Sequence, residues 1–144
     1  MKVLEFRVEI NKPKEIVWFA LWDDLSFRDW ANNIDEGTYI LGDLVEGNEI
    51  QFISSVNGYG VTSLVKRLIP NEYILFKHAS DTQNTGTEIR DKQWTGGSES
   101  YTLTENNGST VLLIKSEIPD ELIDVFNISM PKALERIKYL SEIK

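Results

Sequence analysis

The sequence contains no cysteine and only one histidine, His78. A chain without cysteine has no disulfide framework, no thiolate zinc site and no cysteine nucleophile. A single histidine excludes the zinc sites that are built from two or three imidazoles. No acidic loop has the spacing of calcium ligands, and no phosphate loop, nucleophile elbow or dinucleotide fingerprint is present. We therefore expect no metal site, no cofactor and no assigned set of catalytic residues.

Basic residues are also scarce, with 15 lysines and arginines against 23 aspartates and glutamates and a net charge of −8. A protein that binds nucleic acid needs a concentration of positive charge to contact the phosphates. An anionic membrane surface is disfavoured for the same reason. We therefore expect no nucleic-acid partner, and the negative charge mainly favours solubility.

Long apolar runs are missing as well. Charges at Lys2, Glu5 and Arg7 interrupt the N-terminal segment, where a signal peptide needs about 7–15 uninterrupted apolar residues. No window approaches the roughly 18 apolar residues of a membrane span. Together with the lack of cysteine, which fits a reducing compartment, this predicts a cytoplasmic location and no membrane span.

The composition that remains is that of one globular domain. The chain has 144 residues, of which 41% are apolar and 26% are charged. A domain of this length can bury a sufficient core without metals or disulfides. The sequence has no internal repeat, no low-complexity run and no linker, so we expect a single domain over residues 1–144.

The beginning of the chain predicts one strand and two short helices. Residues 3–10 alternate between apolar and charged side chains, which is typical of a half-buried strand. Asn11 is expected to cap a helix over residues 13–22, whose first residue is proline. The Asp23-Asp24 pair is expected to cap a second helix over residues 25–31.

Strand patterns then fill the chain up to residue 117. The predicted strands span residues 36–41, 48–56, 60–69, 72–79, 98–105 and 109–117. Asn57-Gly58 and Asn106-Asn107-Gly108 are strong turn signals between consecutive strands. The polar segment 80–92 predicts a loop.

The end of the chain predicts a long amphipathic helix that Asp120 is expected to cap. Its apolar residues follow one another at helical spacing. They are Leu122, Phe126, Met130, Ala133, Ile137 and Leu140. Pro131 lies inside this stripe, and proline removes one helical hydrogen bond and clashes with the preceding turn. We therefore expect a kink or a break near residues 127–130.

This order of one strand, two short helices, several strands and a long helix resembles the START-like, or SRPBCC, superfamily. The resemblance implies an α+β helix-grip fold. In this fold a curved antiparallel sheet of six or seven strands surrounds a long C-terminal helix, and the two short helices follow the first strand.

Within this superfamily the chain is most similar to the family of the C-terminal domain of the activator of Hsp90 ATPase. The similarity rests on the order and spacing of short motifs along nearly the whole chain. The motifs are residues 10–18 (INKPKEIVW), 29–30 (DW), 36–37 (EG), 42–47 (GDLVEG), 74–78 (ILFKH), 94–101 (WTGGSESY) and 131–134 (PKAL). The polar segment 79–92 departs from the family pattern.

The resemblance implies a cavity between the concave face of the sheet and the closing helix. Strand alternation and the helical stripe indicate which side chains would line it. The residues expected to contact a guest are Trp30, Phe52, Phe76, His78, Trp94, Glu99, Tyr101, Phe126 and Met130. The plainer interpretation of the apolar members, and of Trp18 and Trp22, is that they only fill the core.

His78 is the most informative polar residue because it shares the inward face of its strand with Ile74 and Phe76. It can pair with Glu99 or Tyr101 as a polar anchor or as an acid-base pair. It can equally be a buried histidine that a neighbour satisfies. Glu99 faces inward only if no bulge at Gly96-Gly97 shifts its strand.

Three functions follow from these observations, in order of preference. The first is the binding of a hydrophobic or amphipathic small molecule or lipid in the cavity. The second is a protein-interaction module with an Hsp90-type chaperone as partner. The third is a cyclase- or hydrolase-like enzyme that uses His78 with Glu99 or Tyr101, so catalysis is the least favoured. We expect a monomer or a homodimer.

Overall fold

The structure is a computed structural model that describes residues 1–83 and 96–144. The described residues form a seven-stranded sheet, three α-helices and one short 3-10 helix, η1. The strands are β1 (Lys2–Ile10), β2 (Thr38–Leu41), β3 (Glu49–Ser54), β4 (Tyr59–Ile69), β5 (Tyr73–Gln83), β6 (Ser98–Asn106) and β7 (Ser109–Ile118). The helices are α1 (Lys14–Trp22), α2 (Asp24–Ala31), η1 (Asp120–Leu122) and α3 (Ile123–Glu142).

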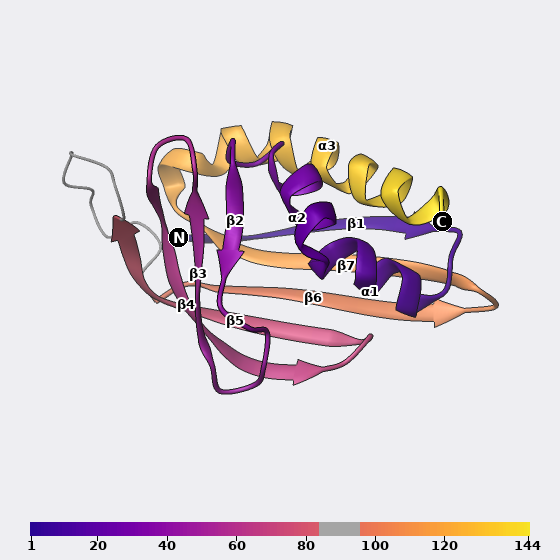
Figure 1. Ribbon diagram of the computed structural model, residues 1–144. Coiled ribbons are helices and arrows are strands. Elements are labelled where there is room, and N and C mark those ends of the chain that lie inside the picture. Colours follow the sequence, from indigo (N-terminus) through magenta and orange to yellow (C-terminus); the bar gives the residue numbers. More distant parts are fainter. Residues whose placement is uncertain (84–95) are drawn as a thin grey trace.

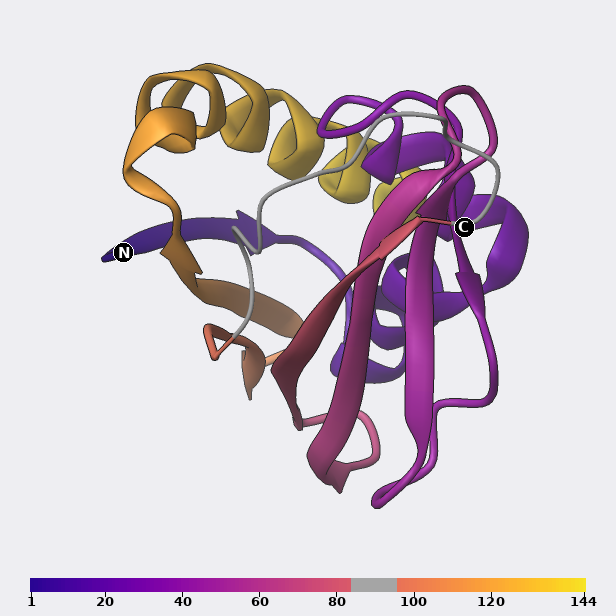
Figure 2. The same ribbon diagram turned by 90° about the vertical axis from the view of Figure 1, so that its left-hand side faces the viewer.

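The strands form one antiparallel sheet in the order β1-β7-β6-β5-β4-β3-β2. All pairs except β1–β7 join strands that are consecutive in the chain, so the first strand lies beside the last. The sheet bends, α3 lies across its concave side, and α1 and α2 cover one end (Figure 1, Figure 2). This arrangement confirms the predicted α+β helix-grip fold.

The core fills the space between the sheet and the helices. The fully buried side chains include Ile74 and Phe76 of β5, Ile114 of β7, and Ala133 and Ile137 of α3. Each buried aliphatic or aromatic side chain contributes about 1.5–3 kcal/mol relative to an exposed one. The C-terminal half of α3 is therefore held firmly against the sheet.

The two short helices confirm one predicted cap and correct the other. The Asp23 carboxylate accepts a hydrogen bond from the Ser26 backbone N–H at 3.3 Å, which caps α2. Asn11 does not cap α1, because the helix begins at Lys14 and Pro13 occupies the cap position without a side-chain bond. The Asn11 side chain instead accepts a hydrogen bond from Ser109 Oγ at 3.1 Å.

The closing helix departs from its prediction in two ways. Asp120 does not cap α3, because it is the first residue of η1. Helix α3 starts at Ile123, and Leu122 occupies its N-cap position without a side-chain hydrogen bond. Near residues 127–130 the sequence predicts a kink or a break, and the helix does not break there, since α3 continues through Pro131. Pro131 leaves the Asn127 carbonyl without its helical donor. Both residues are exposed, so water can satisfy that carbonyl.

Strand β5 is longer than its sequence indicates. It continues to Gln83, so residues 80–83 of the predicted 80–92 loop are strand, and the rest of that loop lies outside the described residues. Ser80 and Asp81 pair with Thr62 and Val61 of β4. Pairing with β4 satisfies the backbone N–H and C=O groups of these residues, whatever their side chains are. For this reason the polar composition of the segment predicted the end of the strand too early.

One ion pair fastens α3 to α2. Arg136 donates to both carboxylate oxygens of Asp29, at 2.6 and 3.0 Å. The hydrogen bonds from Arg136 lower the pKa of Asp29 below its ordinary value of 3.8, because they favour the ionised carboxylate. The Arg136 guanidinium also lies over the ring of Tyr139, 4.7 Å from its centre.

The exchange Asp29→Asn tests the importance of this ion pair. At neutral pH we expect the melting temperature to fall by a few degrees, because a bidentate pair contributes more than an ordinary surface pair. Since the pKa of Asp29 is lowered in the folded protein, its stabilisation is present above the unfolded pKa and is lost as the pH falls through the lowered value. Thermal melts at several pH values should therefore converge for variant and wild type below pH 3.8.

The matched control is Asp43→Asn, which removes the same charge from an exposed residue. A loss of stability as large in Asp43→Asn as in Asp29→Asn would contradict the assignment. So would a difference between Asp29→Asn and wild type that does not depend on pH.

Candidate functional site

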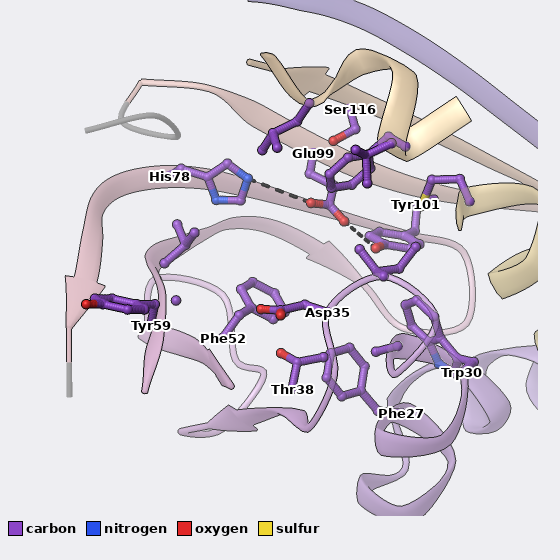
Figure 3. Close-up of a pocket in the computed structure, with 18 of the residues that line it drawn as sticks. Phe27, Trp30, Asp35, Thr38, Phe52, Tyr59, His78, Glu99, Tyr101 and Ser116 are labelled. Carbon is purple, nitrogen blue, oxygen red and sulfur yellow. Dashed lines mark hydrogen bonds and ion pairs between the residues drawn. The ribbon is translucent and has the colours of Figure 1, made fainter. Parts of the chain in front are cut away.

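A cavity of about 460 Å³ lies between the concave face of the sheet and the N-terminal half of α3. Aromatic rings form one wall, contributed by Phe27, Trp30, Phe52 and Tyr101. The helix side consists of Leu122, Val125, Phe126 and Met130. Polar side chains include Asp35, Thr38, His78, Glu99 and Ser116 (Figure 3). A mostly apolar wall with a few converging polar groups is the usual form of a small-molecule site.

Strand register places the polar groups side by side. His78 of β5 lies opposite Ser63 of β4, and Glu99 of β6 lies opposite Ser116 of β7. Tyr101 follows Glu99 by two residues on the same strand, so both side chains point to the same face.

The glycines before β6 do not turn Glu99 away. The His78 backbone N–H donates to the Gly97 carbonyl, while the Gly96 N–H donates to the His78 carbonyl, both at 2.8 Å. This irregularity ends before Ser98, and the pairing of β6 with β5 is regular from there. Glu99 therefore keeps the inward orientation that simple alternation requires.

A chain of four polar side chains crosses one side of the cavity. Ser63 Oγ lies 2.7 Å from His78 Nδ1, and His78 Nε2 lies 3.7 Å from Glu99 Oε2. The Tyr101 hydroxyl donates a hydrogen bond to Glu99 Oε1. Figure 3 shows the Glu99 carboxylate between His78 and Tyr101. Such connected groups hold one another in a fixed geometry in a low-dielectric interior.

Tyr101 is a proton donor over a wide pH range. Its burial raises its pKa well above the ordinary value of 10.0, and the negative charge of Glu99 and the hydrogen bond between them raise it further. The phenol therefore stays protonated at neutral pH and occupies one oxygen of Glu99. The second oxygen, Oε2, faces His78.

Part of this chain has the order of a catalytic triad, with a serine, a histidine and a carboxylate at Ser63, His78 and Glu99. Ser63 is nevertheless inaccessible. Its exposed fraction is 0%, and it does not belong to the cavity lining. A guest in the cavity cannot reach its hydroxyl. The hydrogen bond at Nδ1 instead fixes the orientation of the His78 ring, so that Nε2 faces Glu99.

An aromatic cluster lies behind the cavity wall, with Trp22 at its centre. The Trp22 ring lies 4.8 Å from that of Tyr101 and 5.7 Å from that of Phe76, both edge to face. It also stacks on Phe27 at 6.2 Å. Edge-to-face and offset contacts of this kind add to the energy of simple burial. These ring contacts therefore support the cavity wall from behind.

The structure brings most of the expected contact residues to one cavity. Those that line it are Trp30, Phe52, His78, Glu99, Tyr101, Phe126 and Met130. Phe76 lies behind the wall, fully buried, with its ring 5.2 Å from that of Phe52. Trp94 lies outside the described residues.

Sequence reasoning missed Ser63 and Asp35. The register of β4 against β5 shifts between Thr62 and Ser63, so alternation along β4 does not predict which side chains face inward. Asp35 follows α2 in a connecting segment and carries no periodic signal. Only the pairing of the strands identifies Ser63 as the partner of His78.

A second cavity, of about 440 Å³, lies on the other side of the aromatic cluster. Its lining includes Trp18, Trp22, Ile40, Leu44 and Leu68. The indole N–H of Trp22 is buried and has no hydrogen-bond partner among the described residues. Trp22 and Trp30, which are neighbours in the core, thus face different cavities.

Comparison with solved structures supports the fold. Protein MLL2253 from Mesorhizobium loti has a TM-score of 0.77 and 14% identity, with 99% of this chain and 98% of that one covered. The Aha1 dimer from Colwellia psychrerythraea has a TM-score of 0.65 and 22% identity over 99% and 95%. CalU16 from Micromonospora echinospora has a TM-score of 0.64 and 17% identity over 94% and 71%. At these identities the likeness shows the helix-grip fold alone, and no function.

No protein-family model matches the chain, and no curated protein matches its sequence. Within residues 1–83 and 96–144, no helix is both long enough and apolar enough to cross a membrane. The same residues contain no cluster of three or more histidine, aspartate or glutamate side chains that could hold a metal ion.

The exchange Tyr101→Phe tests the polar chain. At neutral pH we expect the free energy of unfolding to fall by about 1.5–3 kcal/mol, because a buried hydrogen bond to a charged group is lost. Since the pKa of Tyr101 is raised in the folded protein, its stabilisation is present below the unfolded value near 10.0 and is lost as the pH rises through the raised value. Urea unfolding at increasing pH should show the gap between variant and wild type narrowing above pH 10.0.

Tyr139→Phe is the control, because Tyr139 is 52% exposed and its ring can still contact Arg136 as phenylalanine. A gap that stays constant for Tyr101→Phe across this pH range would contradict the coupling of Tyr101 to Glu99.

Proposed function

We propose that the protein binds a hydrophobic or amphipathic small molecule or lipid in the cavity between the sheet and α3. The observation that carries this proposal is the cavity itself, about 460 Å³ with aromatic and aliphatic walls and a polar chain on one side. A volume of this order is typical of ligand pockets, and a few placed polar groups fix the orientation of a guest.

The packing of α3 supports the same proposal. The residues of its C-terminal half that face the sheet, such as Ala133 and Ile137, are fully buried. Nearer its N-terminus the helix lines the cavity, and Val125 there is 52% exposed. Burial of apolar surface contributes about 25 cal/mol per Å², so a guest that covers these walls stabilises the folded protein.

We infer a cytoplasmic location, because the sequence has no cysteine and this composition fits a reducing compartment.

Val61→Trp tests this binding, because Val61 lies on β4 in the cavity lining and a larger side chain would occupy the space of a guest. Native mass spectrometry of freshly purified wild type should show retained mass, or a panel of lipophiles should raise its melting temperature. A guest at a hundredfold excess over its Kd stabilises by about 2.7 kcal/mol. We expect Val61→Trp to lose both effects.

The control is Val56→Trp, the same exchange at a residue that is 63% exposed and outside the cavity lining. It should bind as the wild type does. A wild-type protein that retains no mass and responds to no lipophile would refute the proposal.

A protein-interaction module of the activator of Hsp90 ATPase type is the second candidate. It is supported by the likeness to the solved Aha1 dimer and by the exposed apolar side chains of Val125 and Ile128 on α3. Ile128→Ser should weaken capture of the Hsp90 of the same organism in a pull-down if α3 is the contact surface. Lack of association between the wild-type protein and Hsp90 at micromolar concentrations would exclude this candidate.

An enzyme that uses His78 with Glu99 or Tyr101 is the third candidate. Its support is the contact of 3.7 Å between His78 and Glu99 at the edge of the cavity. The same contact also serves a site that only binds, where it fixes the position of the carboxylate. For this reason we place catalysis below binding.

A further inference from the structure

Glu99 determines which kind of polar group the cavity can receive. Its side chain is 21% exposed and belongs to the cavity lining. The Tyr101 hydroxyl occupies Oε1. Oε2 lies 3.7 Å from His78 Nε2, which is longer than a hydrogen bond. A carboxylate can accept several hydrogen bonds, so Oε2 retains capacity for a donor from the cavity.

Among the residues that the structure describes, the charges near the cavity do not offer a site for an anion. The described residues of the lining include the carboxylates of Glu99 and Asp35 and no lysine or arginine. His78 is charged only when it is protonated, and it then faces Glu99. A guest carboxylate beside Glu99 would bury two negative charges close together, which is strongly unfavourable in a low-dielectric cavity.

The aromatic wall favours a guest with a positive charge. Phe27, Trp30, Phe52 and Tyr101 line the cavity together with Glu99. The faces of aromatic rings attract ammonium groups, and the attraction is stronger where water is excluded. A carboxylate acceptor among aromatic rings is therefore suited to a cationic donor.

We infer that the preferred guest has an apolar body and an amine head, and that Glu99 Oε2 accepts a hydrogen bond from that head. This inference rests on the proposed function, because it names the chemical class of the guest in the same cavity. An alkyl amine is protonated at neutral pH, so it brings both the positive charge and the N–H donors. Fatty acids with the same apolar body are poor guests.

Three probes with the same chain and different heads test the inference: decylamine, decanol and decanoate. Binding to the wild type, measured by isothermal titration calorimetry at neutral pH, should be tightest for decylamine and weakest for decanoate. We expect at least a tenfold difference in Kd between these two, because the amine gains a charge-assisted hydrogen bond that the carboxylate lacks.

The exchange Glu99→Gln should weaken decylamine binding about tenfold or more and decanol binding far less, because the neutral hydroxyl of decanol forms the weaker hydrogen bond with this carboxylate. Glu135→Gln removes the same charge from an exposed residue of α3 that is not part of the lining, and it should bind all three probes as the wild type does. Circular dichroism of each variant shows whether it is folded, and the order of the probes on the wild type is a test that needs no variant.

The outcomes separate the inference from the proposed function. If decanoate binds the wild type as tightly as decylamine, or if Glu99→Gln leaves the difference between them unchanged, the inference is wrong and the proposed function stands. If none of the three probes binds, and the lipophile panel also fails, both are wrong.

Discussion

The packing of the C-terminal half of α3 against the concave face of the sheet is the constraint on which the rest of the structure depends. Ala133 and Ile137 are fully buried there, and the ion pair between Arg136 and Asp29 joins the same half to α2. Because a rigid helix is anchored at one end of a curved sheet, its other end cannot follow the curvature. The cavity is the space that this geometry leaves between the N-terminal half and β4, β5 and β6.

The polar chain from Ser63 to Tyr101 has both a structural and a chemical consequence. Buried polar groups are costly unless they are hydrogen-bonded, and here each group has a neighbour on the same or the adjacent strand. The chain thus gives Glu99 a fixed position at the edge of a mostly apolar space. A fixed carboxylate in such a space is more selective for its partner than one on the surface, because water does not compensate a mismatch.

Much of the fold and part of the site were predictable, and each failure has a local physical reason. Alternation along β6 correctly placed Glu99 and Tyr101 on one inward face. Composition wrongly ended β5 before residue 80, because pairing with β4 satisfies polar residues as well as apolar ones. Pro131 predicted a kink or a break, and the break does not occur, because the carbonyl that loses its hydrogen bond lies at exposed residues of α3.

The sequence by itself determined the periodic features: the alternation of β1 and β6, the inward face of β5 and the apolar stripe of α3. These follow from the fixed repeat of a strand or a helix, which each residue expresses independently of distant parts of the chain. Only the tertiary structure decided the size of the cavity, the pairing of Ser63 with His78 and the exclusion of Phe76 from the lining. Those depend on the register between strands and on the distance between helix and sheet, which local sequence patterns do not encode.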